Sequence, residues 1–154
     1  VVINLQGDLP DLDPLLLHRV LDVLQQDDVD IGTLAVRFDN EEDRLDPNQV
    51  KIVLSKKDNQ DVGRALYFSR ANVPYGSTDA YYHVGIYAYR RKALARYIQL
   101  PVSPLEKAEK LEQLRALEDG MKIGAIIVSS KPTGVDTPAD LERAREKLKN
   151  QSKG

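Results

Sequence analysis

Apolar residues lie along this chain in short runs that polar turns separate. The run from Val1 to Leu5 is rich in β-branched residues, which is typical of a strand buried on both faces of a parallel sheet. Between 82 and 90 apolar residues alternate with polar or aromatic ones, as in a strand with one face in the core. The pattern predicts strands at 1–6, 31–38, 50–54, 64–69, 82–90 and 122–128.

Amphipathic spacing predicts helices, and each of them begins with a capping residue followed by proline. These capping residues are Asp13, Ser103 and Thr137, and proline at the first helical position favours a helix start. The predicted helices span 13–26, 104–119 and 137–150. The apolar face predicted for the first helix consists of Leu17, Val20, Leu21 and Leu24.

Strands and helices alternate over much of the chain, which predicts an α/β domain with a mixed, mainly parallel sheet. The strands between 31 and 90 have no long helix among them, so antiparallel additions are expected there. We expect residues 1–154 to form a single domain. Because the chain begins inside a predicted strand, we also expect its N-terminus to be a cut.

The composition argues against several kinds of binding partner and site. The formal net charge is −2 and no basic stripe is present, which argues against binding to nucleic acid. No apolar run approaches the roughly 20 residues of a membrane span, so no membrane insertion is expected. The chain has no cysteine, which excludes disulfides and thiolate metal sites and favours the reducing cytoplasm.

Two aspartates follow predicted strands and are candidate metal ligands. Asp8 comes after Gly7 at the end of the first strand, and Asp136 lies between the last strand and the last helix. Ligands of open α/β sheets bind beyond the carboxyl ends of strands, and Mg²⁺ prefers a few carboxylates together with phosphate oxygens. From spacing alone, each aspartate can equally be a turn or helix-capping residue.

The strand at 82–90 and the helix at 104–119 offer candidate ligand contacts. His83, Gly85 and Tyr87 share one face of the strand, and the missing side chain of Gly85 leaves a notch that can admit a ligand. The alternative is the solvated face of an edge strand. On the helix, Glu112 and Arg115 fall within the apolar arc. They either pair with each other or leave Glu112 to face a polar ligand.

Several segments, in this order, resemble the 3-deoxy-manno-octulosonate (Kdo) cytidylyltransferases, or CMP-Kdo synthetases, of Gram-negative bacteria. The matching segments are VVINLQGDLP at 1–10, DPNQVKIV at 46–53, ALYFSRANVPYG at 65–76, HVGIYAYRR at 83–91, SPLEKAEKLEQLRALEDGMKI at 103–123 and GVDTPADLERAR at 134–145. Together they cover nearly the whole chain, so the resemblance is specific.

The resemblance implies a Rossmann-like nucleotide-diphospho-sugar transferase fold with αβα layers, incomplete at its N-terminus. It implies a homodimeric enzyme of lipopolysaccharide synthesis, in which the anomeric hydroxyl of Kdo attacks the α-phosphorus of CTP to give CMP-Kdo and pyrophosphate. The family's phosphate-binding loop has no counterpart in this sequence. The chain alone is therefore predicted to be inactive.

The resemblance also implies roles for particular residues. Asp8 and Asp136 match the ligands of Mg²⁺, the expected cofactor, and Arg70 matches the partner of the sugar carboxylate. The full set that matches the sugar pocket is Gln6, Arg70, His83, Tyr87, Glu112 and Gln113.

This sequence departs from the family pattern in two places. Leu9 stands where many relatives have glutamate, which affects the surroundings of the metal, and the loop at 74–82 is short. Two alternatives stay open. One is a cytidylyltransferase for another acidic sugar, such as a sialic acid or an amino-Kdo. The other is a non-catalytic binding or dimerisation fragment that lacks the CTP half.

Overall fold

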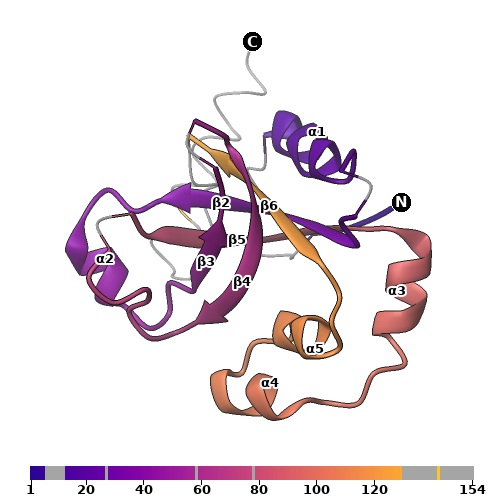
Figure 1. Ribbon diagram of the computed structural model, residues 1–154. Coiled ribbons are helices and arrows are strands. Elements are labelled where there is room, and N and C mark those ends of the chain that lie inside the picture. Colours follow the sequence, from indigo (N-terminus) through magenta and orange to yellow (C-terminus); the bar gives the residue numbers. More distant parts are fainter. Residues whose placement is uncertain (6–12, 27, 58, 78, 130–141, 143–154) are drawn as a thin grey trace.

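A mixed sheet that closes into a small barrel lies at the centre of the fold (Figure 1). The computed structural model describes residues 1–5, 13–26, 28–57, 59–77, 79–129 and 142. The sheet has the order β1-β5-β2-β6-β4-β3, and a further pairing of β3 with β5 closes it. Its strands are β1 (Val2–Asn4), β2 (Ile31–Arg37), β3 (Lys51–Ser55), β4 (Val62–Ser69), β5 (Tyr81–Tyr89) and β6 (Ile123–Val128).

The directions of the strands correct one expectation. A mixed sheet is confirmed, but among the described strands only β2 and β6 pair in parallel, and the other pairings are antiparallel. The prediction of a mainly parallel sheet is therefore wrong for this part of the chain. The short connection from β3 to β4 accounts for the antiparallel pairing of these two strands, because a parallel pair needs a longer crossover.

Helices cover both faces of the sheet. Helix α1 (Pro14–Val23) packs on one face, where Val20 and Val23 are buried against Leu34 and Ile86. Figure 1 shows α3 (Arg91–Tyr97), α4 (Pro104–Glu109) and α5 (Gln113–Glu118) on the other side of the sheet from α1. A short helix, α2 (Glu41–Leu45), follows β2. No helix in the described ranges combines the length and apolar character needed to cross a bilayer.

Helix α1 approaches the sheet closely because two strand positions lack side chains. A Cβ atom at Gly32 of β2 would lie 2.8 Å from the backbone oxygen of Val20. One at Gly124 of β6 would lie 2.7 Å from a methyl group of Val23. Both distances are shorter than van der Waals contact, so glycine at these positions allows the helix to bury its apolar face.

The first predicted helix and the first predicted strand differ in detail from the structure. Asp13 caps α1 through the backbone N–H of Leu15, as its sequence predicts. The buried face consists of Leu16, Val20, Val23 and Leu24, whereas Leu17 and Leu21 are only half-buried. The prediction that the first strand is buried on both faces is wrong, since Val2 is 44% exposed. Strand β1 lies at the edge and pairs only with β5 among the described strands.

The helix predicted over 104–119 is two helices. Lys110 has φ 56°, in the left-handed region, and this residue ends α4 before α5 begins. The single helical wheel that placed Glu112 beside Arg115 therefore does not apply. Arg115 pairs with Glu106 at 2.6 Å, and Glu112 is exposed. The helix predicted at 137–150 lies outside the described residues, apart from position 142.

Candidate functional site

A cavity of about 490 Å³ lies between β5 and the segment that joins α4 to α5. We call it the Arg70 cavity. It is lined by Asn48, Val50, Arg70, Tyr82, His83, Gly85, Tyr87, Lys110, Leu111, Glu112 and Gln113. The structure thus brings together Arg70, His83, Tyr87, Glu112 and Gln113, which come from separate parts of the sequence. Leu111 and Leu114 are buried, as predicted.

The cavity lies beside a gap along one edge of β5. Strand β1 pairs with β5 at 87–89, and β3 pairs with it at 81–82. Between these pairings Gly85 has no cross-strand partner in any described strand. Strand edges without a partner present free N–H and C=O groups, and glycine leaves room for a ligand to reach them. Gly85 lines the cavity, in agreement with the predicted notch, and its role in admitting a ligand stays a prediction.

His83 is held beside the cavity in one tautomer. Its Nε2 lies 3.0 Å from the hydroxyl of Thr33, and that hydroxyl is 2.8 Å from the carbonyl oxygen of Ile86. A hydroxyl has one hydrogen to donate, so when Thr33 donates to Ile86, Nε2 must donate to Thr33. Nδ1 of His83, with no partner among the described residues, is then an acceptor. Burial lowers the pKa of His83 to about 3, so the ring is neutral at physiological pH.

Tyr87 and Gln113 add neutral polar groups. Tyr87 is 3% exposed, and burial raises the pKa of its hydroxyl well above the ordinary value, so it stays protonated. Its ring lies 5.4 Å from that of His83. Gln113 is buried at the first position of α5, and its side-chain amide has no hydrogen-bond partner among the described residues. Both side chains can exchange hydrogen bonds with a hydroxylated ligand.

Arg70 brings a positive charge that no described carboxylate neutralises in an ion pair. Its Nε donates to the backbone oxygen of Glu109 at 2.9 Å, and Nη1 donates to that of Pro47 at 3.2 Å. The Glu109 carboxylate instead accepts from the hydroxyl of Ser69 at 2.7 Å and the backbone N–H of Arg70 at 2.9 Å. The guanidinium is thus oriented by neutral carbonyls and can bind an anion.

Glu112 brings the opposite charge to the same cavity. It precedes α5, its side chain makes no capping hydrogen bond, and its carboxylate forms no ion pair with a described residue. Its backbone oxygen accepts from the hydroxyl of Tyr97 at 3.1 Å, which fixes the backbone beside the cavity. The expectation that Glu112 lies in an apolar helix face is wrong, but its carboxylate can accept hydrogen bonds from ligand hydroxyls.

Three predicted site residues, Gln6, Asp8 and Asp136, lie outside the described residues. Over the described ranges, no group of three acidic or histidine side chains is suited to a metal ion. The strands that precede the two aspartates do run in the same direction. Both β1 and β2 are antiparallel to β5, and β6 is parallel to β2.

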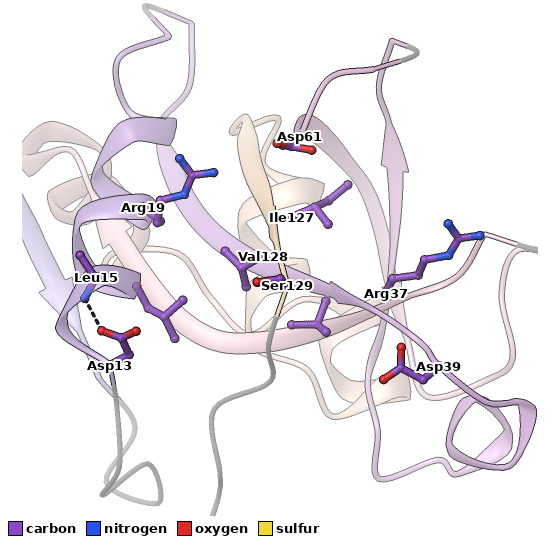
Figure 2. Close-up of a pocket in the computed structure, with 11 residues that line it drawn as sticks. Asp13, Leu15, Arg19, Arg37, Asp39, Asp61, Ile127, Val128 and Ser129 are labelled. Atoms are coloured by element: carbon purple, nitrogen blue, oxygen red, sulfur yellow. Dashed lines mark hydrogen bonds between the residues drawn. The ribbon is translucent and has the colours of Figure 1, made fainter.

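A second cavity, of about 580 Å³, lies at the carboxyl ends of β2 and β6. Figure 2 shows Arg19 from α1 and Arg37 from β2 on either side of Ser129. We call it the Arg37 cavity. Its charged groups are partly engaged, since Arg37 pairs with Asp79 and Asp13 caps α1. Ligands of open sheets bind beyond the carboxyl ends of strands, which favours this cavity, yet none of its described lining residues is a predicted sugar-binding residue.

Comparison with known proteins shows the family to which the chain belongs. Residues 1–123 match the family model described as Cytidylyltransferase. The chain belongs to the cytidylyltransferase family. A solved structure described as CMP:2-keto-3-deoxy-manno-octonic acid synthetase complexed with CTP superposes with a TM-score of 0.84 at 38% identity. That match covers 97% of this chain and 61% of the other, so the chain shares the fold of that structure over the matched part.

Curated relatives give the same picture. The chain is 54% identical over 148 residues to the 3-deoxy-manno-octulosonate cytidylyltransferase of Paramagnetospirillum magneticum, covering 96% of this chain and 60% of that protein. It is 57% identical over 148 residues to the enzyme of the same name from Rhodopseudomonas palustris, with the same coverage. The chain therefore spans about 60% of the length of these relatives.

The sequence did not identify three residues of the Arg70 cavity that carry polar groups, Asn48, Tyr82 and Lys110. Asn48 was recognised only as part of a turn, because nothing in the sequence shows that this turn meets β5 across the barrel. Lys110 was placed inside a helix, since lysine is a good helix former and gives no sign of a left-handed conformation. The signals available for Asn48 were the turn residues Asp46-Pro47-Asn48 and the matching segment DPNQVKIV at 46–53.

Proposed function

We propose that this chain is the sugar- and metal-binding part of a Kdo cytidylyltransferase, which transfers CMP from CTP to Kdo and releases pyrophosphate. The observation that carries the proposal is the Arg70 cavity. It combines an arginine without an ion-pair partner among the described residues with neutral and acidic hydrogen-bonding groups. An acidic, polyhydroxylated sugar has the complementary groups. The names of the relatives support Kdo as that sugar.

The residues of the cavity have distinct roles in this proposal. Arg70 binds the sugar carboxylate through charge-assisted hydrogen bonds. Glu112 accepts from sugar hydroxyls, and Gln113 and Tyr87 donate or accept. Nδ1 of His83 accepts from a hydroxyl. With its pKa held near 3, His83 is a poor base at neutral pH, so it orients the sugar and does not remove its proton.

In the reaction, the anomeric oxygen of Kdo forms a bond to the α-phosphorus of CTP, and the bond to the pyrophosphate oxygen breaks. The carboxylates of Asp8 and Asp136 suit a hard cation and would hold Mg²⁺. When bound, this ion neutralises triphosphate charge and lowers the pKa of the attacking hydroxyl. The common direction of β1 and β6 supports the pairing of these aspartates, since strands of one direction end at the same edge.

The proposal extends to the whole enzyme. It includes the Rossmann-like nucleotide-diphospho-sugar transferase domain of which residues 1–154 are a portion, CTP as the second substrate, a homodimer and a role in lipopolysaccharide synthesis. These parts depend on the relatives, which are longer than this chain.

A full-length chimaera tests the proposal. In it, this chain replaces the matching 148 residues of the P. magneticum relative. With CTP and Mg²⁺ we expect CMP-Kdo formation from Kdo, and at least tenfold lower kcat/KM with N-acetylneuraminate, since each mismatched contact costs about 1 kcal/mol or more. A preference for N-acetylneuraminate would mean that the substrate is a sialic acid and not Kdo. A chimaera that folds but is inactive would count against the proposed cytidylyltransferase activity.

A further inference from the structure

A buried cation lies next to the Arg70 cavity without lining it. Lys51, the first residue of β3, is 0% exposed. Its Nζ donates to the backbone oxygens of Asp46 at 2.8 Å and Gln49 at 2.7 Å. Lysine is seldom fully buried unless its ammonium group has partners, and here the partners identified are backbone carbonyls.

The two carbonyls belong to the turn that leads into β3. In this turn the backbone N–H of Gln49 donates to the oxygen of Asp46 at 3.1 Å. The N–H of Asn48 donates to the Asp46 carboxylate at 2.8 Å. The ammonium group of Lys51 therefore binds both ends of the turn and fixes its shape.

The same turn contacts the candidate sugar-binding groups. The backbone oxygen of Pro47 accepts from Nη1 of Arg70, and the side chain of Asn48 lines the cavity. The next residue, Val50, accepts from the backbone N–H of His83 at 2.8 Å. A change in the turn would therefore alter the position of Arg70. It would leave β5 in its hydrogen-bonded ladder with β2.

We infer that Lys51 is a positioning residue, which holds the 46–49 turn so that Arg70 and Asn48 meet the acidic group of the ligand. This inference rests on the proposed sugar-binding function of the Arg70 cavity. Burial lowers the pKa of Lys51, Asp46 opposes this effect, and the nearby charge of Arg70 adds to it. An anion bound at Arg70 offsets that repulsion, so the buried cation also favours an acidic ligand.

Calorimetric titration of the 154-residue chain with Kdo tests the inference through Lys51→Met, which keeps the length of the side chain and removes the ammonium group. We expect Kd for Kdo to rise roughly three- to tenfold, the effect of losing about one oriented hydrogen bond. Lys57→Met, which removes the same charge from an exposed position, should change Kd less than about twofold. The uncharged methyl ester of Kdo should bind equally well to the parent and to Lys51→Met.

A double-mutant cycle shows whether Lys51 acts through Arg70. In an Arg70→Ala background, Lys51→Met should cause little further loss, because coupled residues are not additive. Additive losses, an equal loss for the methyl ester, or no loss for Kdo would each overturn the inference. If the parent chain does not bind Kdo, the proposed function fails and the inference with it. Should Lys51→Met not fold, Lys51→Gln takes its place, and unfolding of both would make Lys51 a requirement of the core instead.

Discussion

At the scale of single residues, the Arg70 cavity combines charges of both signs, those of Arg70, Lys110 and Glu112, that remain outside ion pairs with described residues. Backbone carbonyls orient the guanidinium of Arg70, and a hydrogen bond to its backbone oxygen holds Glu112, so no described side chain neutralises either charge in an ion pair. The alternation of β5 predicted that His83 and Tyr87 share a face with the Gly85 notch. The buried position of Lys51 was not predictable, because lysine normally indicates a solvated surface. The left-handed conformation of Lys110 was not predictable either, because lysine is a good helix former.

Replacing Arg70 should affect the sugar far more than the nucleotide. In the chimaera, Arg70→Ala should raise the KM for Kdo about ten- to a hundredfold, since a charge-assisted hydrogen bond contributes roughly 1.5–3 kcal/mol. The KM for CTP should change little. Arg64→Ala, at an exposed position of β4, the strand that ends just before Arg70, is the matched control. Equal losses for both substrates would contradict the assigned role.

His83 should make the fold sensitive to acid. Its pKa is about 3 in the folded chain, against about 6.5 when unfolded. Between these values only the unfolded state binds the proton, so stability falls as the pH decreases from 6.5 towards 3. At pH 4.5 the loss relative to pH 7 is about 2–3 kcal/mol.

Urea denaturation at pH 7 and pH 4.5 measures this loss. In His83→Gln the difference between the two pH values should shrink by that amount, whatever the variant's stability at pH 7. The exposed His18 provides the control variant His18→Gln, which should behave as the parent. An unchanged pH dependence in His83→Gln would show that His83 is accessible to protons in the folded state.

At the scale of elements, the sequence predicted the long strands and the start of α1 well, because periodicity and capping residues are local signals. It did not predict α2 and α3, which are short and have little periodicity. It also joined α4 and α5 into one helix. Their separation depends on tertiary contacts, chiefly the packing of Leu111 in the core and the contact of Glu109 with β4.

The Glu106–Arg115 pair should hold α4 and α5 together. The side chains are 12% and 19% exposed, and Arg115 donates from Nε and Nη2 to the two carboxylate oxygens at 2.7 and 2.6 Å. Arg115→Met leaves a largely buried carboxylate without its partner, so we expect a loss of about 1–3 kcal/mol in the free energy of unfolding. Lys122→Met breaks the exposed pair with Asp28 and should cause a clearly smaller loss, because solvent screens exposed ion pairs. Equal losses, measured by chemical denaturation, would contradict this difference.

At the scale of the whole molecule, the closed sheet places two cavities in different parts of one unit. The Arg70 cavity uses the gap beside β5, and the Arg37 cavity lies at the ends of the parallel strands. The sequence predicted helices on both faces of the sheet but not the closure of the sheet into a barrel. The pairing of β3 with β5 closes it, and the hydrophobic patterns of these strands would be the same in an open sheet. The match to the P. magneticum relative covers only 60% of that protein, so the activity expected of the chain alone is a separate question from that of the whole enzyme.

The chain alone should form no CMP-Kdo from CTP, Kdo and Mg²⁺. Phosphoryl transfer depends mainly on positioning and on stabilising the triphosphate charge. In the Arg37 cavity, Arg37 already pairs with Asp79, and the chain spans only about 60% of its curated relatives. A pyrophosphate-release assay with the chimaera as positive control measures this. Product from the chain alone would mean that its own residues complete the CTP site.

Which cavity binds the sugar is tested most directly by two-dimensional NMR of the ¹⁵N-labelled chain during titration with Kdo. We expect amide shifts to change around the Arg70 cavity, at Arg70, His83, Gly85, Glu112 and Gln113, and to stay constant at Arg19, Arg37 and Ser129. In Arg70→Ala the same changes should require roughly ten- to a hundredfold more Kdo. Changes confined to the Arg37 cavity, or none at all at saturating Kdo, would contradict the assignment of the sugar site.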